Sequence, residues 1–186
     1  PGMRPNLAPF SFFTVASRNP AVLAISISQP ADASKPDKDT LASIRATGQF
    51  VVNIATRSLL DQLVTSSIEF PRGVDEFAAT GLTPRPADLV DAPLVAEAPI
   101  AMECRLRSLV EIGTDVLVLG DVLRIHAHGG LVDHRMRVRH DRLQPVGRMA
   151  GPSFCLDFDV VVREAADCTV ADVPEPGDTG LGSTEP

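Results

Sequence analysis

One segment of regular alternation constrains the fold most. Between Ile100 and Val110, apolar residues alternate with Glu103, Arg105 and Arg107. Successive side chains of a strand point to opposite faces, so this pattern predicts an antiparallel strand with one face in the core. The following segment, 115–128, has an unbroken apolar centre, VLVLG. That run predicts a second long strand, covered on both faces.

Shorter patterns predict the remaining elements. Further strands are expected at 23–28, 49–55, 131–138 and 154–162, and the third of these would follow a hairpin turn at Gly129-Gly130. We expect a helix that Asp39 caps and Gly48 ends, a second helix at 59–67, and one helical turn at 75–80. These elements predict a mainly β fold, a β-barrel with short helices.

Composition excludes several classes of function. The chain has 186 residues, 44% of them hydrophobic, which suits one domain with a sizeable core. A net charge of −7 argues against a nucleic-acid surface and against a polybasic membrane contact. No apolar run reaches the roughly 20 residues of a membrane span. The 3 cysteines are odd in number and lack CxxC spacing, which predicts no disulfide framework or zinc site and a cytoplasmic location.

Two further predictions concern the ends of the chain. The first residue is Pro1 and no secretory signal pattern follows it, so we expect a fragment of a longer product. Residues 1–165 are expected to form the folded domain. Residues 166–186 are acidic, rich in Pro and Gly, and poor in large apolar side chains, which predicts a flexible tail.

The stretch NLAPFSFF, Asn6–Phe13, combines three Phe with an Asn, a Pro and a Ser. The whole chain has only 8 Phe and no Trp or Tyr. A core strand would alternate or be uniformly apolar, and this stretch does neither. It is therefore a candidate binding surface.

A second candidate is a phosphate site. Ser26 and Ser28 lie on the polar face of the strand at 23–28, while Lys38 precedes the helix that starts with Asp39 and Thr40. Helix N-termini attract phosphates, and the hydroxyls and the ammonium add donors. The alternative is a solvated loop with an Asp cap, since the motif is not a Walker A loop.

Histidines and cysteines offer weaker candidates. His126 and His128 would share one strand face, with Asp133 and His134 across the hairpin, either as a metal site or as an exposed hairpin. Cys104 lies on an apolar strand face and is expected in the core. Glu103 and Glu111 are interpreted as isolated carboxylates, so no acid/base pair is predicted. Of the two interpretations of the histidines, the exposed hairpin is favoured, and no metal site is predicted.

An ordered set of motifs resembles a known family, the flavin reductase-like, FMN-binding split-barrel proteins. The resemblance is strongest to the branch of nitrilotriacetate monooxygenase component B-like reductases, and covers roughly residues 6–155. The matching stretches are Asn6–Phe13, Asn19-Pro20, Lys38–Leu41 (KDTL), Phe50–Asn53 (FVVN), Asp75–Phe77, Gly81–Thr83, Glu103-Cys104, Gly120–Val122 leading to His126, and Pro145–Arg148 (PVGR) with Gly151.

The resemblance implies a flavin site and its residues. The segment matching Asn6–Ser11 would lie along the flavin, its backbone meeting the polar edge of the isoalloxazine ring. Ser26, Lys38 and Thr40 would hold the phosphate, and His126 would lie near flavin or nicotinamide. The full set of implied flavin-binding residues is Asn6, Leu7, Ala8, Pro9, Phe10, Ser11, Ser26, Ile27, Ser28, Lys38, Asp39, Thr40, Phe77 and Arg148.

The resemblance also implies an activity, hydride transfer from NADH or NADPH to FMN or FAD. It further implies a Greek-key split barrel that forms a homodimer and supplies reduced flavin to a partner monooxygenase. The alternative is a flavin-binding electron carrier that does not oxidise nicotinamides. Two departures from the family pattern stand out. Only 5 residues precede Asn6, where the family has a further strand, and Phe154 replaces a common Tyr.

Overall fold

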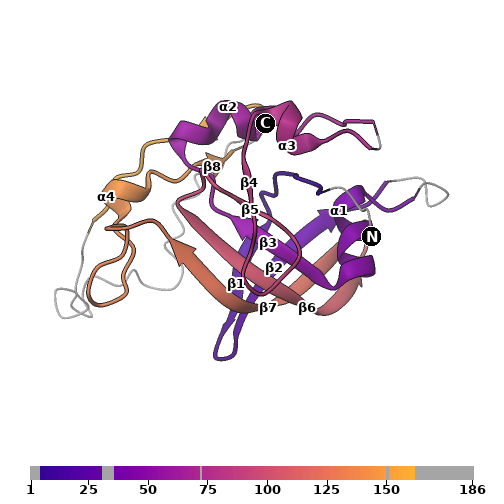
Figure 1. The fold of residues 1–186 in the computed structure, drawn as a ribbon, viewed down its shortest axis with the longest axis horizontal. Helices are drawn as coiled ribbons and strands as arrows, with labels where there is room; N and C mark the ends of the chain where they lie inside the picture. The colour runs from indigo at the N-terminus through magenta and orange to yellow at the C-terminus, as the bar shows by residue number, and fades with distance from the viewer. Residues whose placement is uncertain (1–4, 31–35, 72, 150, 162–186) are drawn as a thin grey trace, which may run out of the picture.

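The computed structural model describes residues 5–30, 36–71, 73–149 and 151–161. Its centre is one antiparallel sheet that curves around the core (Figure 1). The strand order is β1 (Phe13–Arg18), β2 (Ala21–Ser28), β7 (Asp115–Ala127), β6 (Ile100–Ile112) and β3 (Gln49–Asn53). Two small pairs join β4 (Pro84–Arg85) to β5 (Leu94–Val95) and β8 (Gly147–Arg148) to β9 (Phe154–Cys155). The mainly β fold predicted from the sequence is confirmed.

Among the described residues, five short helical elements accompany the sheet: α1 (Asp39–Thr47), η1 (Arg57–Leu59), α2 (Leu60–Thr65), α3 (Glu76–Thr80) and α4 (His140–Leu143). Gly48 ends α1 with a φ of 67° and Gly81 ends α3 with a φ of 72°, a conformation that glycine adopts without strain. The predicted cap of α1 is wrong. Lys38 occupies the N-cap position, and Asp39 is the first helical residue, where its charge favours the helix dipole.

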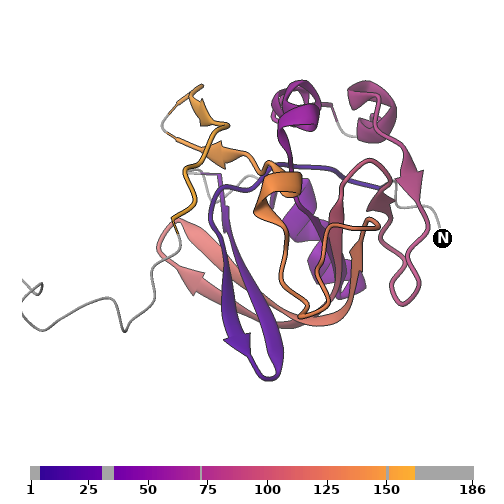
Figure 2. The ribbon, with the colours of Figure 1, turned by 90° about the vertical axis from the view of Figure 1, so that its left-hand side faces the viewer.

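The layers of the fold leave room for a site between them. Helices α2 and α3 lie together above one end of the sheet (Figure 1). The chain before β1 runs between these helices and the sheet, as Figure 2 shows from the side. The first part of NLAPFSFF, residues 6–10, is therefore partly covered by the fold, whereas Ser11 and Phe12 are exposed.

The main core fills the space between the sheet and α1. Phe50 packs so closely on Gly120 that a Cβ there would lie 2.3 Å from a ring carbon, which explains a glycine inside a long strand. Cys104 is fully buried, and burial raises the pKa of its thiol to about 12, so its predicted place in the core is confirmed. The buried members of the core are Leu23, Ile25, Ile27, Leu41, Ile44, Phe50, Cys104, Val116 and Val118.

One predicted strand does not form, and another is much shorter than predicted. Residues 131–138 make only one bridge, between Val132 and Val138, because the Asp133 carboxylate accepts from the N–H groups of Arg135 at 2.8 Å and Arg137 at 2.9 Å and closes a tight loop. The last strand is limited to Phe154–Cys155. The residues after it, up to 161, find no partner strand in the described chain, and Phe158 stays 50% exposed. Residue 162 and the predicted tail lie outside the described residues.

Candidate functional site

A cavity of about 740 Å³ opens between the sheet and the α2–α3 layer. Its volume falls within the range of roughly 300–1,000 Å³ that small-molecule sites occupy. The walls come from residues 5–11, from α1, β3 and α2, and from the segments 91–98 and 145–148. Apolar side chains dominate, among them Leu7, Phe10, Phe50 and Phe77. Such a cavity suits a ligand with a flat apolar body.

Hydrogen bonds hold the N-terminal segment across this cavity. The Asn6 amide donates to Glu76 Oε2 at 2.9 Å, and its oxygen accepts from the Thr40 hydroxyl at 2.8 Å. The Leu7 N–H donates to the same Glu76 oxygen. One side chain thus links the segment to α1 and α3. The predicted phosphate ligand Thr40 is engaged here, although its oxygen can still accept.

Beyond this anchor, several backbone polar groups of the segment have no hydrogen-bond partner in the described residues. The backbone groups of Ala8, Phe10 and Ser11 make no hydrogen bond to any part of the chain that the structure describes, yet all three residues line the cavity. Pro9 between them has no N–H and cannot join a sheet ladder. The Gln62 amide oxygen, on the opposite wall, is buried without a partner. Unpaired polar groups beside apolar walls fit a heteroaromatic ligand with a polar edge.

The predicted site residues divide into two groups. The structure brings to the cavity Asn6, Leu7, Ala8, Pro9, Phe10, Ser11, Thr40, Phe77 and Arg148. The cavity wall does not include Ser26, Ile27, Ser28, Lys38 or Asp39. Ile27 is fully buried in the core, and Ser28 pairs with Asp115 at the end of β2. The phosphate-binding role of this second group stays a prediction.

Arg148 closes one end of the cavity. Its Nε donates to the Gly151 carbonyl at 2.8 Å, and its guanidinium lies over the Phe154 ring, 5.0 Å from the centroid. Phe154 thus supports a charged group that lines the cavity, a stacking role that requires no hydroxyl. Within the part of the chain that the structure describes, the remaining guanidinium nitrogens have no hydrogen-bond partner and can bind an anionic part of a ligand.

One wall of the cavity is held by contacts that were not predicted from the sequence. Residues 88–95 are fixed to the sheet because side chains of the strands accept from the loop's backbone N–H groups. Gln49 Oε1 accepts from Asp91 N at 2.7 Å, and Asn53 Oδ1 accepts from Val95 N at 3.0 Å. Polar residues within the predicted strand at 49–55 were the only available signal.

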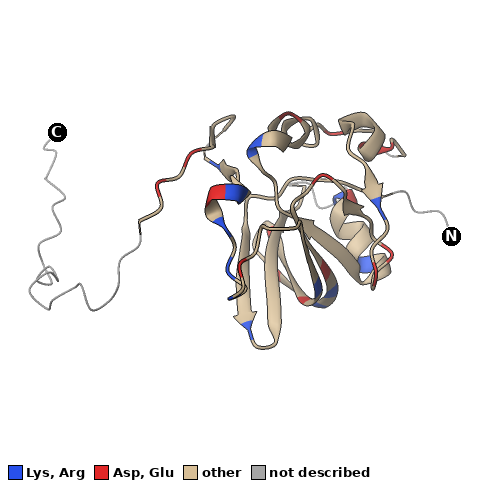
Figure 3. Cartoon of the chain, turned by 60° about the vertical axis from the view of Figure 1, so that its left-hand side comes forward, with Lys and Arg blue, Asp and Glu red and all other residues tan. Residues whose placement is uncertain are grey.

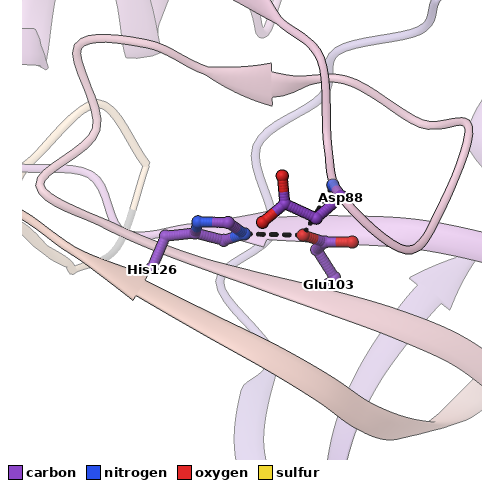
Figure 4. A group of neighbouring side chains, drawn as sticks. All are labelled: Asp88, Glu103 and His126. Carbon is purple, nitrogen blue, oxygen red and sulfur yellow. Dashed lines mark hydrogen bonds and ion pairs between the residues drawn. The ribbon is translucent and has the colours of Figure 1, made fainter.

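Glu103 provides the strongest of these attachments. Its carboxylate accepts from the N–H groups of Asp88 at 3.0 Å and Leu89 at 2.6 Å, and lies 2.6 Å from His126 Nε2 (Figure 4). The side chain is fully buried. The interpretation of Glu103 as an isolated carboxylate is therefore wrong: alternation placed it opposite the core, but the loop covers that face too.

Burial alone raises the pKa of Glu103, but the hydrogen bonds from His126, Asp88 and Leu89 outweigh it and lower the pKa below its usual range. The carboxylate is therefore ionised at neutral pH and acts as an acceptor. His126 Nε2 must then carry the proton, which leaves Nδ1 on the other side of the ring (Figure 4). Neither residue lines the large cavity.

The alternative interpretation of the histidines, a metal site of His126 with His128, Asp133 and His134, is not found among the described residues. In the described residues, the one group with close ligand atoms is Asp88, Glu103 and His126, whose atoms lie within 4.8 Å of one another. The Arg124 guanidinium forms an ion pair with Asp88 at 2.5 Å, and the loop N–H groups bind Glu103. These partners account for the charges without a metal.

A pH dependence follows from Glu103. A carboxyl group with a lowered folded-state pKa stabilises the fold above its unfolded pKa and loses that contribution as pH falls through the folded value. We expect Glu103→Gln to be less stable than the native chain at neutral pH. The difference should shrink below about pH 4, the ordinary carboxyl range. Urea unfolding of both proteins from about pH 7 to pH 3 measures it; a constant difference would contradict the prediction.

Comparison with known proteins decides the family. A family model described as a flavin reductase like domain matches residues 1–142. The chain belongs to the flavin reductase-like family. An uncharacterized protein of Aquifex aeolicus is 34% identical over 153 residues, 82% of this chain and 77% of that relative. A Deinococcus radiodurans relative, also uncharacterized, is 36% identical over 148 residues, but this alignment spans only 64% of its length.

Solved structures agree with this assignment. Nitrilotriacetate monooxygenase component B from Bacillus cereus aligns with a TM-score of 0.80 at 27% identity, over 85% of this chain and 79% of that one. The 2-nitrobenzoate 2-nitroreductase of Pseudomonas fluorescens aligns with a TM-score of 0.76 at 29% identity, over 92% and 81% of the two chains. The split-barrel fold and the resemblance to component B-like flavin reductases are confirmed. Within the described residues, no helix is long and apolar enough to cross a membrane.

Proposed function

We propose that this protein binds FMN in the large cavity and reduces it with a hydride from NADH or NADPH. The observation that carries the proposal is the unpaired backbone of Ala8–Ser11, which lines an apolar cavity of about 740 Å³. Family membership supports flavin reduction in general. FAD is the alternative flavin, and a flavin-binding electron carrier is the alternative activity.

In this proposal, the residues of the chain bind the flavin and hold it in a fixed orientation. Leu7, Phe10 and Phe50 cover an apolar ring, while the free backbone groups of residues 8–11 and the Gln62 amide oxygen meet its polar edge. Arg148 offers a positive charge at one end, and Thr40 an oxygen at α1. When bound, FMN supplies the hydride-accepting chemistry itself. The cavity wall therefore needs no acid/base pair; its task is to exclude water and align two flat rings.

We further propose a homodimer and a partner monooxygenase. Edge strand β1 exposes Val15 by 59%, and Phe12 just before it is 67% exposed, an apolar edge that a second copy would cover. The name of the Bacillus cereus protein, a monooxygenase component, supports a partner of that class. A cytoplasmic location remains a prediction from the cysteine pattern.

An anaerobic visible spectrum tests the proposal. The full chain is titrated with FMN, and NADH or NADPH is then added. With no Trp or Tyr in the protein, changes in the flavin bands report binding directly. A shifted band that bleaches faster than free FMN with the same nicotinamide supports a reductase. A shifted band that survives both nicotinamides indicates an electron carrier, and an unshifted band would refute flavin binding.

The substitution Gln62→Met should change FMN affinity without lowering the stability of the fold. The Gln62 amide oxygen is buried and unpaired, so replacing it by a side chain of similar volume should leave the free energy of unfolding unchanged or raise it by up to about 1 kcal/mol. The FMN dissociation constant should rise by about tenfold, because the ligand loses a hydrogen bond. Urea unfolding and flavin titration measure the two effects. A fall in stability with unchanged FMN affinity would show a structural role only.

A further inference from the structure

A second hollow lies on the other side of the 94–99 segment. This cleft, of about 590 Å³, shares only Ala98 with the flavin cavity. Its polar lining side chains are Arg85, His126 and His128; the rest of the lining is small or apolar, namely Ala96, Ala98, Pro99, Ile125 and Ala127. No carboxylate is among the described residues that line it. Three nitrogen-bearing side chains therefore line one space, and the nearby carboxylates, Glu103 and Asp88, lie beside His126 and outside this lining.

A hydrogen bond to Glu103 fixes the orientation of the His126 ring. Glu103, itself fully buried, binds His126 Nε2 at 2.6 Å and leaves Nδ1 on the opposite side of the ring (Figure 4). The other charged groups near the pair are Asp88 and Arg124, which neutralise each other in an ion pair. Arg85 and His128 have no hydrogen-bond or ion-pair partner for their side chains in the described residues. The donors of Arg85 and His128 are thus unused, whereas Glu103 already binds His126 Nε2.

Positive charge continues beside the cleft. Arg142 donates to the Gly130 carbonyl at 3.3 Å, two residues beyond His128 in the chain. Figure 3 shows several basic residues on α4 and on the chain that leads to it, with acidic residues among them. The whole protein has a net charge of −7, so this region opposes the overall sign. The local field favours an anion at the cleft.

We propose that the Arg85–His126–His128 cleft binds a phosphate group, either as the free anion or as part of a nucleotide. The Arg85 guanidinium and the His128 imidazole provide directed donors to several oxygens of one anion. The buried Glu103 fixes the orientation of His126, which lines the same space. The inference goes beyond the proposed flavin site and does not depend on it.

Ring signals of the 4 histidines, followed by NMR in the full chain, test this inference. Inorganic phosphate and adenosine 2′,5′-bisphosphate are titrated separately, at constant ionic strength, with and without FMN. We expect the His126 and His128 signals to shift while those of His134 and His140 do not. A tighter fit to the bisphosphate would identify a nucleotide as the source of the phosphate; equal affinity would identify the free anion.

A matched pair of variants provides the control. The double variant Arg85→Ala/His128→Ala removes two cleft donors but leaves the Glu103–His126 pair intact. It should weaken binding at least tenfold. His134→Ala/Arg135→Ala removes the same side-chain types from an exposed loop outside the cleft and should change affinity less than twofold. Unmoved His126 and His128 signals, or equal weakening by both variants, would overturn the proposal.

Discussion

Replacing Glu103 by Ala should lower the free energy of unfolding by about 2–4 kcal/mol, the cost of leaving two buried loop N–H groups without an acceptor. Glu103 is fully buried and accepts from both Asp88 and Leu89. The variant also frees His126 from its only fixed partner. Urea unfolding measures the loss, and amide hydrogen exchange at Asp88 and Leu89 locates it.

Glu97→Ala is the matched control. Glu97 also accepts from a loop backbone, binding the Thr83 N–H at 3.1 Å through both oxygens, but its side chain is exposed. Water can replace an exposed acceptor, so its loss should cost less than about 1 kcal/mol. Similar losses in the two variants would show that burial of Glu103 contributes little. Unchanged exchange at Asp88 and Leu89 would argue against its role in fixing the loop.

The strands and the cavity differ in how far the sequence predicts them. Period-two alternation predicted β6 and β7 because side-chain direction along a strand is a local property. The same rule failed for Glu103, since the cover on its face comes from residues 86–98, a separate segment. It failed again at 131–138, where one Asp133 side chain competes with strand pairing for the backbone N–H groups.

The N-terminal segment shows the value of an irregular pattern. NLAPFSFF suits neither a strand nor a helix, and its place along a cavity wall explains why. Its anchor, however, could not be predicted from local sequence. Glu76 lies 70 residues from Asn6, and only the fold brings them together. Ligand contacts of the backbone are likewise invisible in side-chain identities.

Replacing Glu76 by Ala should raise the FMN dissociation constant by about 10- to 100-fold. The Glu76 carboxylate accepts from the Asn6 amide and the Leu7 N–H, and these two bonds hold the free backbone of residues 8–11 against the cavity. Hydrogen bonds to a charged acceptor contribute roughly 1.5–3 kcal/mol each, less here because the side chain is half-buried. A loosened segment must be ordered again when FMN binds, which weakens affinity.

A double-mutant cycle gives this prediction its sharpest form. Asn6→Ala removes the other half of the same anchor, so the double variant Asn6→Ala/Glu76→Ala should bind FMN little worse than Glu76→Ala alone. Glu111→Ala, which removes a carboxylate that is 82% exposed, should leave FMN affinity unchanged. Flavin fluorescence titration measures the native chain and all four variants. Additive losses would mean that Asn6 and Glu76 act separately, and an unchanged affinity in Glu76→Ala would place the flavin outside this cavity.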